Sequence, residues 1–170
     1  MRIMGIDPGL RSTGWGVIEV DGHHTVGVGS GVIRSSGEAL AERLLTIYSQ
    51  LTVVVESYAP DQVAIEQTFV SRDGASTLKL GHARGIALLV PAKARMPVHE
   101  YAPNTVKKAV TGVGHASKQQ VAYMVGVLLA FRGKISVDQS DALAVALTHA
   151  AYGRSAGVLR TSLAQSQNVQ

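Results

Sequence analysis

The first sixteen residues, MRIMGIDPGLRSTGWG, constrain the fold more than any other stretch of this chain. Residues 3–6 form a short apolar run that ends in a single carboxylate, Asp7, and a Pro-Gly pair then turns the backbone. A second extended run occupies residues 13–20. The pattern predicts a hairpin that presents Asp7 at one end of a sheet. The alternative is that Asp-Pro-Gly serves the turn alone.

The first half of the chain reads as strands followed by a helix and another strand. Residues 2–7, 13–20 and 25–33 are extended runs joined by short Gly-containing turns, which predicts an antiparallel meander. In residues 38–58, apolar side chains recur at steps of three and four, which predicts an amphipathic helix. Residues 62–66 then form a short apolar strand that again ends in a carboxylate.

The second half is mostly helical. We expect a helix over residues 75–93, a fifth strand over residues 97–101 and a short helical turn after Pro103. Ser117 with Gln120 predicts a capping box that opens a third long helix, ending near residue 131. The final helix should run from about residue 138 to residue 152.

This order predicts an α/β fold of the ribonuclease-H-like class. A three-strand antiparallel meander plus two parallel strands makes a mixed five-stranded sheet flanked by helices. With 170 residues and no linker, one domain is expected, spanning residues 1–153. Residues 154–170 are rich in Ser and Gln, so we expect a flexible C-terminal tail.

Composition narrows the function classes. The absence of cysteine excludes disulfides, thiolate zinc sites and cysteine nucleophiles. No apolar run approaches the ~18 residues of a membrane span, and the chain enters its first strand without a secretory signal. These features are compatible with a reducing cytoplasm and predict no membrane partner.

Charge is distributed unevenly along the chain. Residues 1–66 carry four Lys and Arg against eight Asp and Glu, whereas residues 67–137 carry ten against two, a net charge of +8. An acidic half beside a basic segment suggests a carboxylate site next to a surface that binds a polyanion. The alternative is an ordinary population of solvated lysines.

Four carboxylates occupy positions that can converge. Asp7 and Glu66 end the first and fourth strands, which are neighbours in this strand order, while Asp138 and Asp141 lie three apart at the start of the last helix. Singly, each has a structural explanation: Glu66 as an ion pair, Asp138 as a helix cap, Asp141 as a partner of the helix dipole. Jointly, they would repel one another unless cations hold them. Oxygen ligands without cysteine indicate Mg²⁺ or Mn²⁺, and two such ions about 4 Å apart can cleave a phosphodiester.

Five motifs give the chain a specific resemblance. They are GIDPGxxxTGxG from residue 5, AIEQxF from residue 64, LKLGxARG from residue 78, GxGxAxKxQV from residue 112 and DxxDALAxA from residue 138. Together, and in this order, they resemble the RuvC-type Holliday junction resolvases over roughly residues 1–152. The loop after Phe69 and the C-terminal tail are the parts least similar to the family.

The resemblance implies a metal-dependent endodeoxyribonuclease that resolves four-way DNA junctions by paired nicks, leaving 5′-phosphate and 3′-hydroxyl ends, in recombination and repair. It implies a homodimer in the bacterial cytoplasm, associated with the nucleoid and with a branch-migration motor of the RuvA–RuvB type. The family's roles carry over to the matching positions as follows. Asp7, Glu66, Asp138 and Asp141 would be the catalytic metal ligands, and Lys107 and Lys118 would lie near the scissile phosphate. Phe69 would stack on a junction base, with Arg72 in the same loop. Beside these family roles, Lys79, Arg84 and Lys108 of the basic segment are further candidate DNA contacts.

Three other readings remain open. A related ribonuclease-H-like nuclease acting on RNA would keep the first-strand Asp but should lack the Lys118 motif and the Phe69 loop. Actin-like ATPases also place Asp-x-Gly after their first strand, but they need two such domains, which 170 residues cannot supply. A non-catalytic junction-binding protein should have a broken acidic cluster. Phe69 could also be a loop anchor packed on the core.

Overall fold

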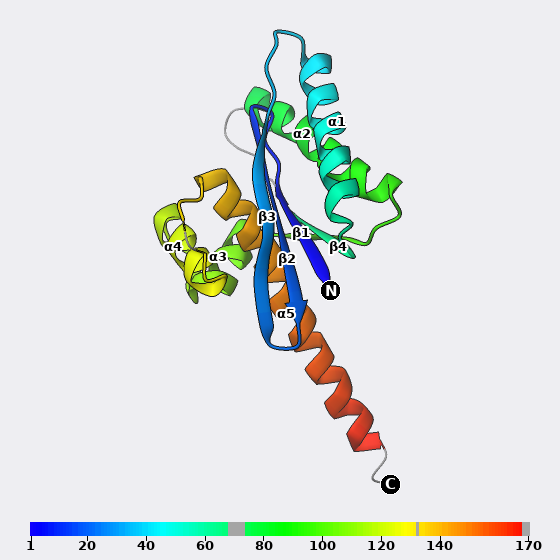
Figure 1. Ribbon diagram of the computed structural model, residues 1–170, viewed down its shortest axis with the longest axis vertical. Helices are drawn as coiled ribbons and strands as arrows, with labels where there is room; N and C mark the ends of the chain where they lie inside the picture. Colours follow the sequence, from blue (N-terminus) through cyan, green and yellow to red (C-terminus); the bar gives the residue numbers. More distant parts are fainter. Residues whose placement is uncertain (68–73, 132, 168–170) are drawn as a thin grey trace.

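The protein is built on one five-stranded sheet with helices on both faces (Figure 1). The computed structural model describes residues 1–67, 74–131 and 133–167. The predicted stacking residue Phe69 and its neighbour Arg72 therefore lie outside the described residues. The strands and helices are β1 (Arg2–Asp7), β2 (Ser12–Asp21), β3 (His24–Arg34), α1 (Leu40–Tyr58), β4 (Gln62–Glu66), α2 (Gly74–Lys93), β5 (Val98–Tyr101), α3 (Pro103–Thr111), α4 (Lys118–Leu128) and α5 (Val137–Gln167).

The predicted sheet is confirmed. Its order is β3-β2-β1-β4-β5, with β1–β2 and β2–β3 antiparallel and β1–β4 and β4–β5 parallel. The central strand β1 is covered on both faces, which explains why Ile3, Met4 and Ile6 are fully buried and why its sequence is continuously apolar. β1 and β4 are neighbours, as the strand order predicts, so their carboxyl ends meet at one edge of the sheet.

Two hydrophobic clusters lie on opposite faces of the sheet. α1 and α2 pack on one face, where Met4, Ile6, Ile47 and Leu51 are buried together. α3, α4 and α5 cover the other face, and their apolar side chains pack with Ile3, Ile18 and Ala64. In Figure 1, α5 crosses behind the strands and continues beyond the body of the molecule toward the C-terminus. The sheet is thus the middle of three layers.

α5 lies so close to β1 and β2 that only glycine fits at two positions. A Cβ on Gly5 would stand 2.0 Å from the backbone oxygen of Ala142, and a Cβ on Gly14 would stand 2.1 Å from the backbone oxygen of Asp138. The backbone of α5 therefore rests directly on the strands. This contact fixes the start of α5 beside the carboxyl end of β1.

Three helix boundaries differ from the sequence-based expectation. α5 continues to Gln167 instead of ending near residue 152, since nothing in residues 153–167 breaks a helix as proline would. The expected helical turn after Pro103 is a nine-residue helix, because Pro103 suits the first helical position and Gly112 ends it in a left-handed conformation. α4 ends at Leu128, earlier than residue 131, and Ala130 has a positive φ of 48°. The division into a nuclease domain and a flexible tail stays a prediction.

None of the helices in the described part of the chain combines the length and apolar character that a membrane crossing requires.

Candidate active site

Asp7 occupies the carboxyl end of the central strand. The turn that follows it is held by Thr13, a fully buried residue whose hydroxyl donates to the Gly9 carbonyl at 2.8 Å and accepts from the Gly9 amide at 3.4 Å. The turn is thus stabilised by Thr13 and does not need the Asp7 carboxylate as its cap. Turn chemistry alone does not account for Asp7.

Glu66 ends the neighbouring parallel strand at the same edge of the sheet. Ile6 pairs with Ile65, so the next residue of each strand, Asp7 and Glu66, projects from adjacent strand ends. A hydrogen bond joins the two side-chain carboxyl groups. Two carboxyl groups can share such a bond only when one of them keeps its proton.

Asp138 and Asp141 enter from the first turns of α5. The helix is capped by Ser136: its hydroxyl accepts from the Gln139 amide, and the Gln139 side chain accepts from the Ser136 amide. This capping box excludes the alternative in which Asp138 is the helix cap. Sequence reasoning missed Ser136, although the same Ser-x-x-Gln signature was used to place Ser117.

Lys118 and Lys107 complete the site from the helices on that face. The predicted capping box of Ser117 and Gln120 is confirmed, and it places Lys118 at the first position of α4. Lys118 Nζ donates to Asp141 Oδ2 at 2.8 Å. Lys107 of α3 is half-buried beside them. A cavity of about 180 Å³ is lined by Glu66, Pro103, Val106, Lys107, Lys118, Val121, Asp141 and Ala144.

The electrostatics of Asp7 reflect its crowded position. The pKa of Asp7 is raised from its ordinary value of 3.8 to about 8, first by burial and then by the negative charges of Glu66 and Asp141. The cation of Lys118 acts in the opposite direction, and Asp138 makes the smallest contribution. Asp7 and Glu66 therefore share one proton between them.

Glu66 is shifted in the same direction. Burial is the largest cause that raises its pKa, and the negative charge of Asp141 adds to it. Lys118, the hydrogen bond from Asp7 and Lys107 lower the pKa. The structure brings Asp7, Glu66 and Asp141 together with both lysines, and Asp138 lies at the margin of this group.

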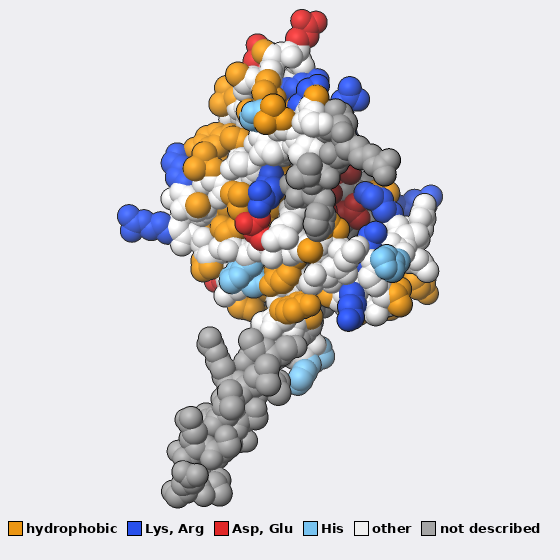
Figure 2. Space-filling model, turned by 180° about the vertical axis from the view of Figure 1, so that it is seen from behind, with side chains coloured by type: hydrophobic (Ala, Val, Ile, Leu, Met, Phe, Trp, Pro, Cys, Tyr) orange, Lys and Arg blue, Asp and Glu red, His pale blue; other side chains and the backbone are white. Residues whose placement is uncertain are grey.

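The donor set fits a hard divalent cation. The acidic side chains come from three elements and offer only oxygen ligands, and their mutual repulsion is relieved by a bound cation. Across residues 1–67, 74–131 and 133–167, no group of three or more His, Asp or Glu side chains is already arranged to hold a metal ion. One Asp141 oxygen is engaged by Lys118. On the face seen in Figure 2, acidic side chains near the middle lie beside Lys and Arg side chains.

The predicted DNA contacts have different surroundings. Lys108 on α3 and Lys79 on α2 are exposed. Arg84 is half-buried and forms an ion pair with Glu100 of β5, which leaves fewer of its donors for a phosphate. The structure thus presents Lys79 and Lys108 to solvent and engages Arg84 within the chain.

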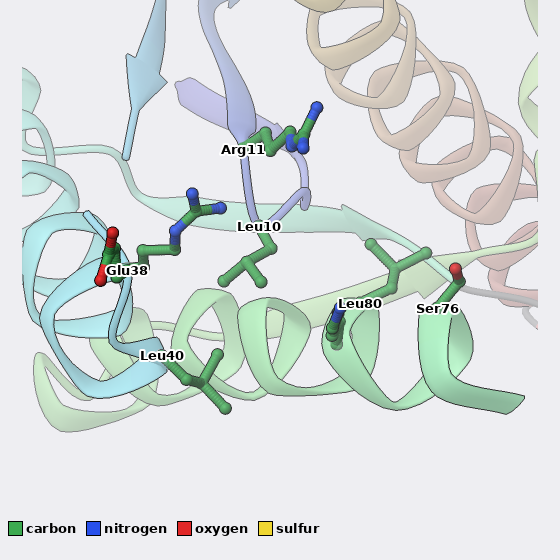
Figure 3. Close-up of a pocket in the computed structure, with 8 residues that line it drawn as sticks. Leu10, Arg11, Glu38, Leu40, Ser76 and Leu80 are labelled. Carbon is green, nitrogen blue, oxygen red and sulfur yellow. The ribbon is translucent and has the colours of Figure 1, made fainter. Parts of the chain in front are cut away.

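A larger cavity, of about 480 Å³, opens near the turn that follows Asp7. In Figure 3, Leu10 points toward the helix that carries Ser76 and Leu80, whereas the guanidinium of Arg11 points away from it. Sequence reasoning did not single out Arg11, which lies four residues after Asp7 in a conspicuous motif. The lining residues are Leu10, Arg11, Glu38, Leu40, Arg43, Ser76, Lys79 and Leu80.

Comparison with known proteins finds one family over nearly the whole chain. The model of the family described as crossover junction endodeoxyribonuclease RuvC matches residues 3–149. The chain is 58% identical over 153 residues to the crossover junction endodeoxyribonuclease RuvC of Ruegeria pomeroyi, covering 90% of this chain and 93% of that relative. It is 52% identical over 166 residues to the corresponding protein of Cereibacter sphaeroides, covering 98% and 99%.

Solved structures agree with the sequence matches. RuvC of Thermus thermophilus in complex with Holliday junction substrate aligns with a TM-score of 0.85 at 36% identity, over 92% of this chain and 96% of that chain. The yeast mitochondrial Holliday junction resolvase aligns with a TM-score of 0.69 at 14% identity, over 96% and 83%, a likeness of fold alone.

Proposed function

We infer that this chain, which belongs to the RuvC family of crossover junction endodeoxyribonucleases, is a Holliday junction resolvase acting in DNA recombination and repair. The family is metal-dependent. The observation that carries the assignment of the active site is the convergence of Asp7, Glu66 and Asp141 beside two lysines at one edge of the sheet. The family match argues against the RNA-nuclease, ATPase and non-catalytic readings, and the intact acidic group argues further against the non-catalytic one.

We propose that Asp7, Glu66, Asp138 and Asp141 hold two Mg²⁺ or Mn²⁺ ions. When bound, such ions supply an activated water and stabilise the leaving oxygen of the phosphodiester. The raised pKa values of Asp7 and Glu66 support this assignment, because the burial and mutual repulsion that raise them are offset when a cation replaces the shared proton. Asp138 contributes least to the electrostatics of the group, so we assign it the weakest ligand role.

The two lysines act on the substrate and on the ligands. Lys118 is largely exposed, with 65% of its side chain accessible, while its amine reaches Asp141. It can therefore leave Asp141 and approach a scissile phosphate, where a cation stabilises the charge that develops in the transition state. Lys107 lines the same cavity and lowers the pKa of Glu66, which favours the ionised form that a metal requires.

We propose that the DNA backbone is bound beyond the cavity by exposed cations. Lys108 continues from Lys107 along α3, and Lys79 with Arg11 and Arg43 lines the larger cavity near Asp7. Phe69 belongs to this proposal through its family motif alone, and Arg72 through its place in the same loop. Arg84 contributes less, since Glu100 occupies its guanidinium.

Paired nicks require two active sites, so we propose a homodimer. α2 supports this with a face whose apolar residues are exposed in the single chain, with Leu78 65% and Leu89 53% accessible. A Cβ on Gly81 or Gly85 would meet nothing within 4 Å, so this face is open to close approach by a second copy. Because its relatives are bacterial and its substrate is chromosomal DNA, we place the protein in the bacterial cytoplasm with the nucleoid and a RuvA–RuvB type motor.

The direct test compares labelled four-way, three-way and linear DNA, each incubated with the protein and Mg²⁺ or Mn²⁺. We expect symmetric nicks in the four-way junction, with ligatable ends, and little cleavage of linear duplex. Equal cleavage of all three substrates, or cleavage that persists in a chelator, would contradict the proposal.

A further inference from the structure

His149 of α5 is a buried side chain that the proposed chemistry does not use. Its exposed fraction is 6%, and both ring nitrogens have partners. Nδ1 lies 2.7 Å from the Tyr101 hydroxyl of β5, and Nε2 lies 2.5 Å from Gln62 Oε1 of β4. We call these three residues, His149, Tyr101 and Gln62, the His149 clamp. It joins α5 to the two parallel strands β4 and β5.

The bonding pattern fits a neutral ring. Gln62 Oε1 can only accept, so Nε2 donates, and in the neutral ring Nδ1 then accepts from the Tyr101 hydroxyl. Burial and the stacked ring of His99, with centroids 4.3 Å apart, lower the pKa of His149 to about 4. At neutral pH the clamp therefore keeps one tautomer and one set of hydrogen bonds.

The clamp lies on the same stripe of α5 as a catalytic carboxylate. Asp141, Val145 and His149 follow at four-residue intervals, so they share one side of the helix over about 12 Å. On β4, Gln62 and Glu66 are four residues apart and face the same side of the sheet, separated by about 13 Å. The two spacings match, with Asp141 beside Glu66 at one end and His149 bonded to Gln62 at the other.

The packing of α5 on β1 and β2 does not by itself set the position of Asp141 relative to Glu66. Gly5 and Gly14 seat α5 on β1 and β2, which sets its position relative to Asp7. Glu66 belongs to β4, on the other side of β1. Of the contacts that bind α5 to β4 and β5, the hydrogen bonds of His149 are directional, whereas Ala64 packs by shape alone.

We propose that the His149 clamp is a positioning device, which sets Asp141 on α5 relative to Glu66 on β4 so that both can hold the same cation. This inference rests on the proposed function of those carboxylates. His149, Tyr101 and Gln62 are positioning residues, because they act on the ligands through the helix and strands that carry them. Losing a partner that is hydrogen-bonded directly to a metal ligand typically costs 10–100-fold in metal affinity or activity, and the clamp acts one step further out, so we take the lower end of that range.

The test compares Tyr101→Phe, which removes one hydroxyl and keeps the ring, with His149→Ala and with His149→Gln, whose amide can restore a donor and an acceptor. The matched control is Thr148→Val. It deletes another hydrogen bond from the same helix, that from the fully buried Thr148 hydroxyl to the Ala144 carbonyl at 2.8 Å, and leaves the clamp intact.

For each variant, three quantities are measured: the Mg²⁺ concentration for half-maximal single-turnover junction cleavage, the rise in melting temperature with Mg²⁺, and junction affinity without metal. We expect Tyr101→Phe and His149→Ala to raise the half-maximal concentration at least about tenfold and to reduce the Mg²⁺-induced rise. Junction affinity should stay within about twofold, and His149→Gln should recover most of the loss.

The proposal is overturned if Tyr101→Phe keeps the wild-type response to Mg²⁺, or if Thr148→Val, at an equal loss of melting temperature, shifts that response as much. Should His149→Ala fail to fold, the Tyr101→Phe result decides. A wild-type protein that does not cleave junctions would contradict the proposed function instead, and the melting temperatures with Mg²⁺ would still test the clamp.

Discussion

The unfavourable electrostatics of the site act most strongly on the Asp7 carboxyl group. It is buried at the end of the central strand, next to Glu66 and within the field of Asp141, and its pKa is raised to about 8. A residue needed only to form the turn would not require this buried and negatively charged environment, and Thr13 already stabilises the turn. Unfavourable burial of a carboxyl group is typical of a functional site.

Replacing Asp7 with Asn should abolish junction cleavage and leave junction binding largely intact. Asn is a weaker ligand for a cation, but it removes negative charge next to a polyanion. The measurement is the single-turnover rate and the dissociation constant on a labelled junction. Asp21→Asn, a carboxylate at the far end of β2, is the control and should cleave normally. If Asp7→Asn cleaves at more than a tenth of the wild-type rate, Asp7 serves only the Asp-Pro-Gly turn and is not a catalytic ligand.

The same substitution should change stability in a pH-dependent way when metal is removed. The pKa of Asp7 is raised from 3.8 to about 8, so between these values the folded chain keeps a proton that the unfolded chain releases. Stability should therefore decrease as pH rises through this window. Asn imitates the protonated acid, so Asp7→Asn should melt above wild type at pH 8 in chelator, with the difference vanishing toward pH 4. Adding Mg²⁺ should narrow the gap, whereas a pH-independent difference would refute this account.

Residues at strand ends could be found from the sequence, but partners distant in the chain could not. Asp7 and Glu66 are each marked by an apolar strand and a polar stop, and the strand order places them side by side. The hydrogen bonds of His149 join it to residues 48 and 87 positions away, and no local pattern encodes such a pairing. Ser136 could have been predicted from the sequence, because its capping box is a local signature.

α5 is the element through which the sheet and the site are connected. It rests on β1 and β2 through Gly5 and Gly14, and it carries Asp138 and Asp141 at its beginning. Because its backbone touches the strands, a small change where α5 packs on Gly5 and Gly14 should displace both carboxylates together. The Gly residues are thus part of the construction of the site.

Gly5→Ala should lower both the melting temperature and the cleavage rate. The new methyl group would stand 2.0 Å from the backbone oxygen of Ala142, which a backbone atom cannot relieve by changing rotamer. We expect a loss of about 1–3 kcal/mol in the free energy of unfolding and at least a tenfold slower cleavage. Denaturant titration and single-turnover kinetics measure the two effects.

Gly126→Ala in α4 is the matched control for this prediction. A Cβ there would meet nothing within 4 Å, and alanine favours a helix over glycine by about 1 kcal/mol. It should therefore be neutral or stabilising. Equal behaviour of the two variants would show that α5 is not seated on Gly5 in solution.

The periodicity of the apolar residues predicted which strands and helices exist, but it did not predict where they end. The strands and helices appear where the apolar patterns placed them, because burial imposes that spacing. The length of α5 was missed because its later residues carry few apolar anchors, although Ala, Leu, Gln and Arg all favour a helix. α3 was underestimated for the same reason, since a nine-residue helix shows barely two turns of pattern.

Across the molecule, a basic segment contributes lysines to an acidic site, where Lys107 and Lys118 line one cavity with Glu66 and Asp141. Residues 67–137 carry a net charge of +8, and the exposed lysines of α2 and α3 belong to it. The combination lets a polyanion approach carboxylates that would otherwise repel it.

Junction binding should depend steeply on salt. Each phosphate neutralised by a Lys or Arg releases counterions and adds ~0.9 to the slope of log affinity against log salt. Lys108→Ala should reduce that slope by about one contact. Arg2→Ala should leave the slope unchanged. Arg2 lies at the opposite end of β1 from Asp7, and it already forms an ion pair with Glu19. A flat salt response in the wild type would exclude the basic segment as the binding surface.

The assembly should be a dimer formed through the open face of α2, defined by Leu78, Gly81, Gly85 and Leu89. Two exposed leucines flanking two bare glycines let a second helix approach closely and bury apolar surface. Light scattering at micromolar concentration should give twice the chain mass of 17.9 kDa. Leu78→Glu should yield folded monomers that bind junctions weakly and no longer nick two strands together. Leu45→Glu, at an equally exposed leucine of α1, should remain a dimer. A wild-type species of 17.9 kDa would refute the dimer, and a dimeric Leu78→Glu would move the interface elsewhere.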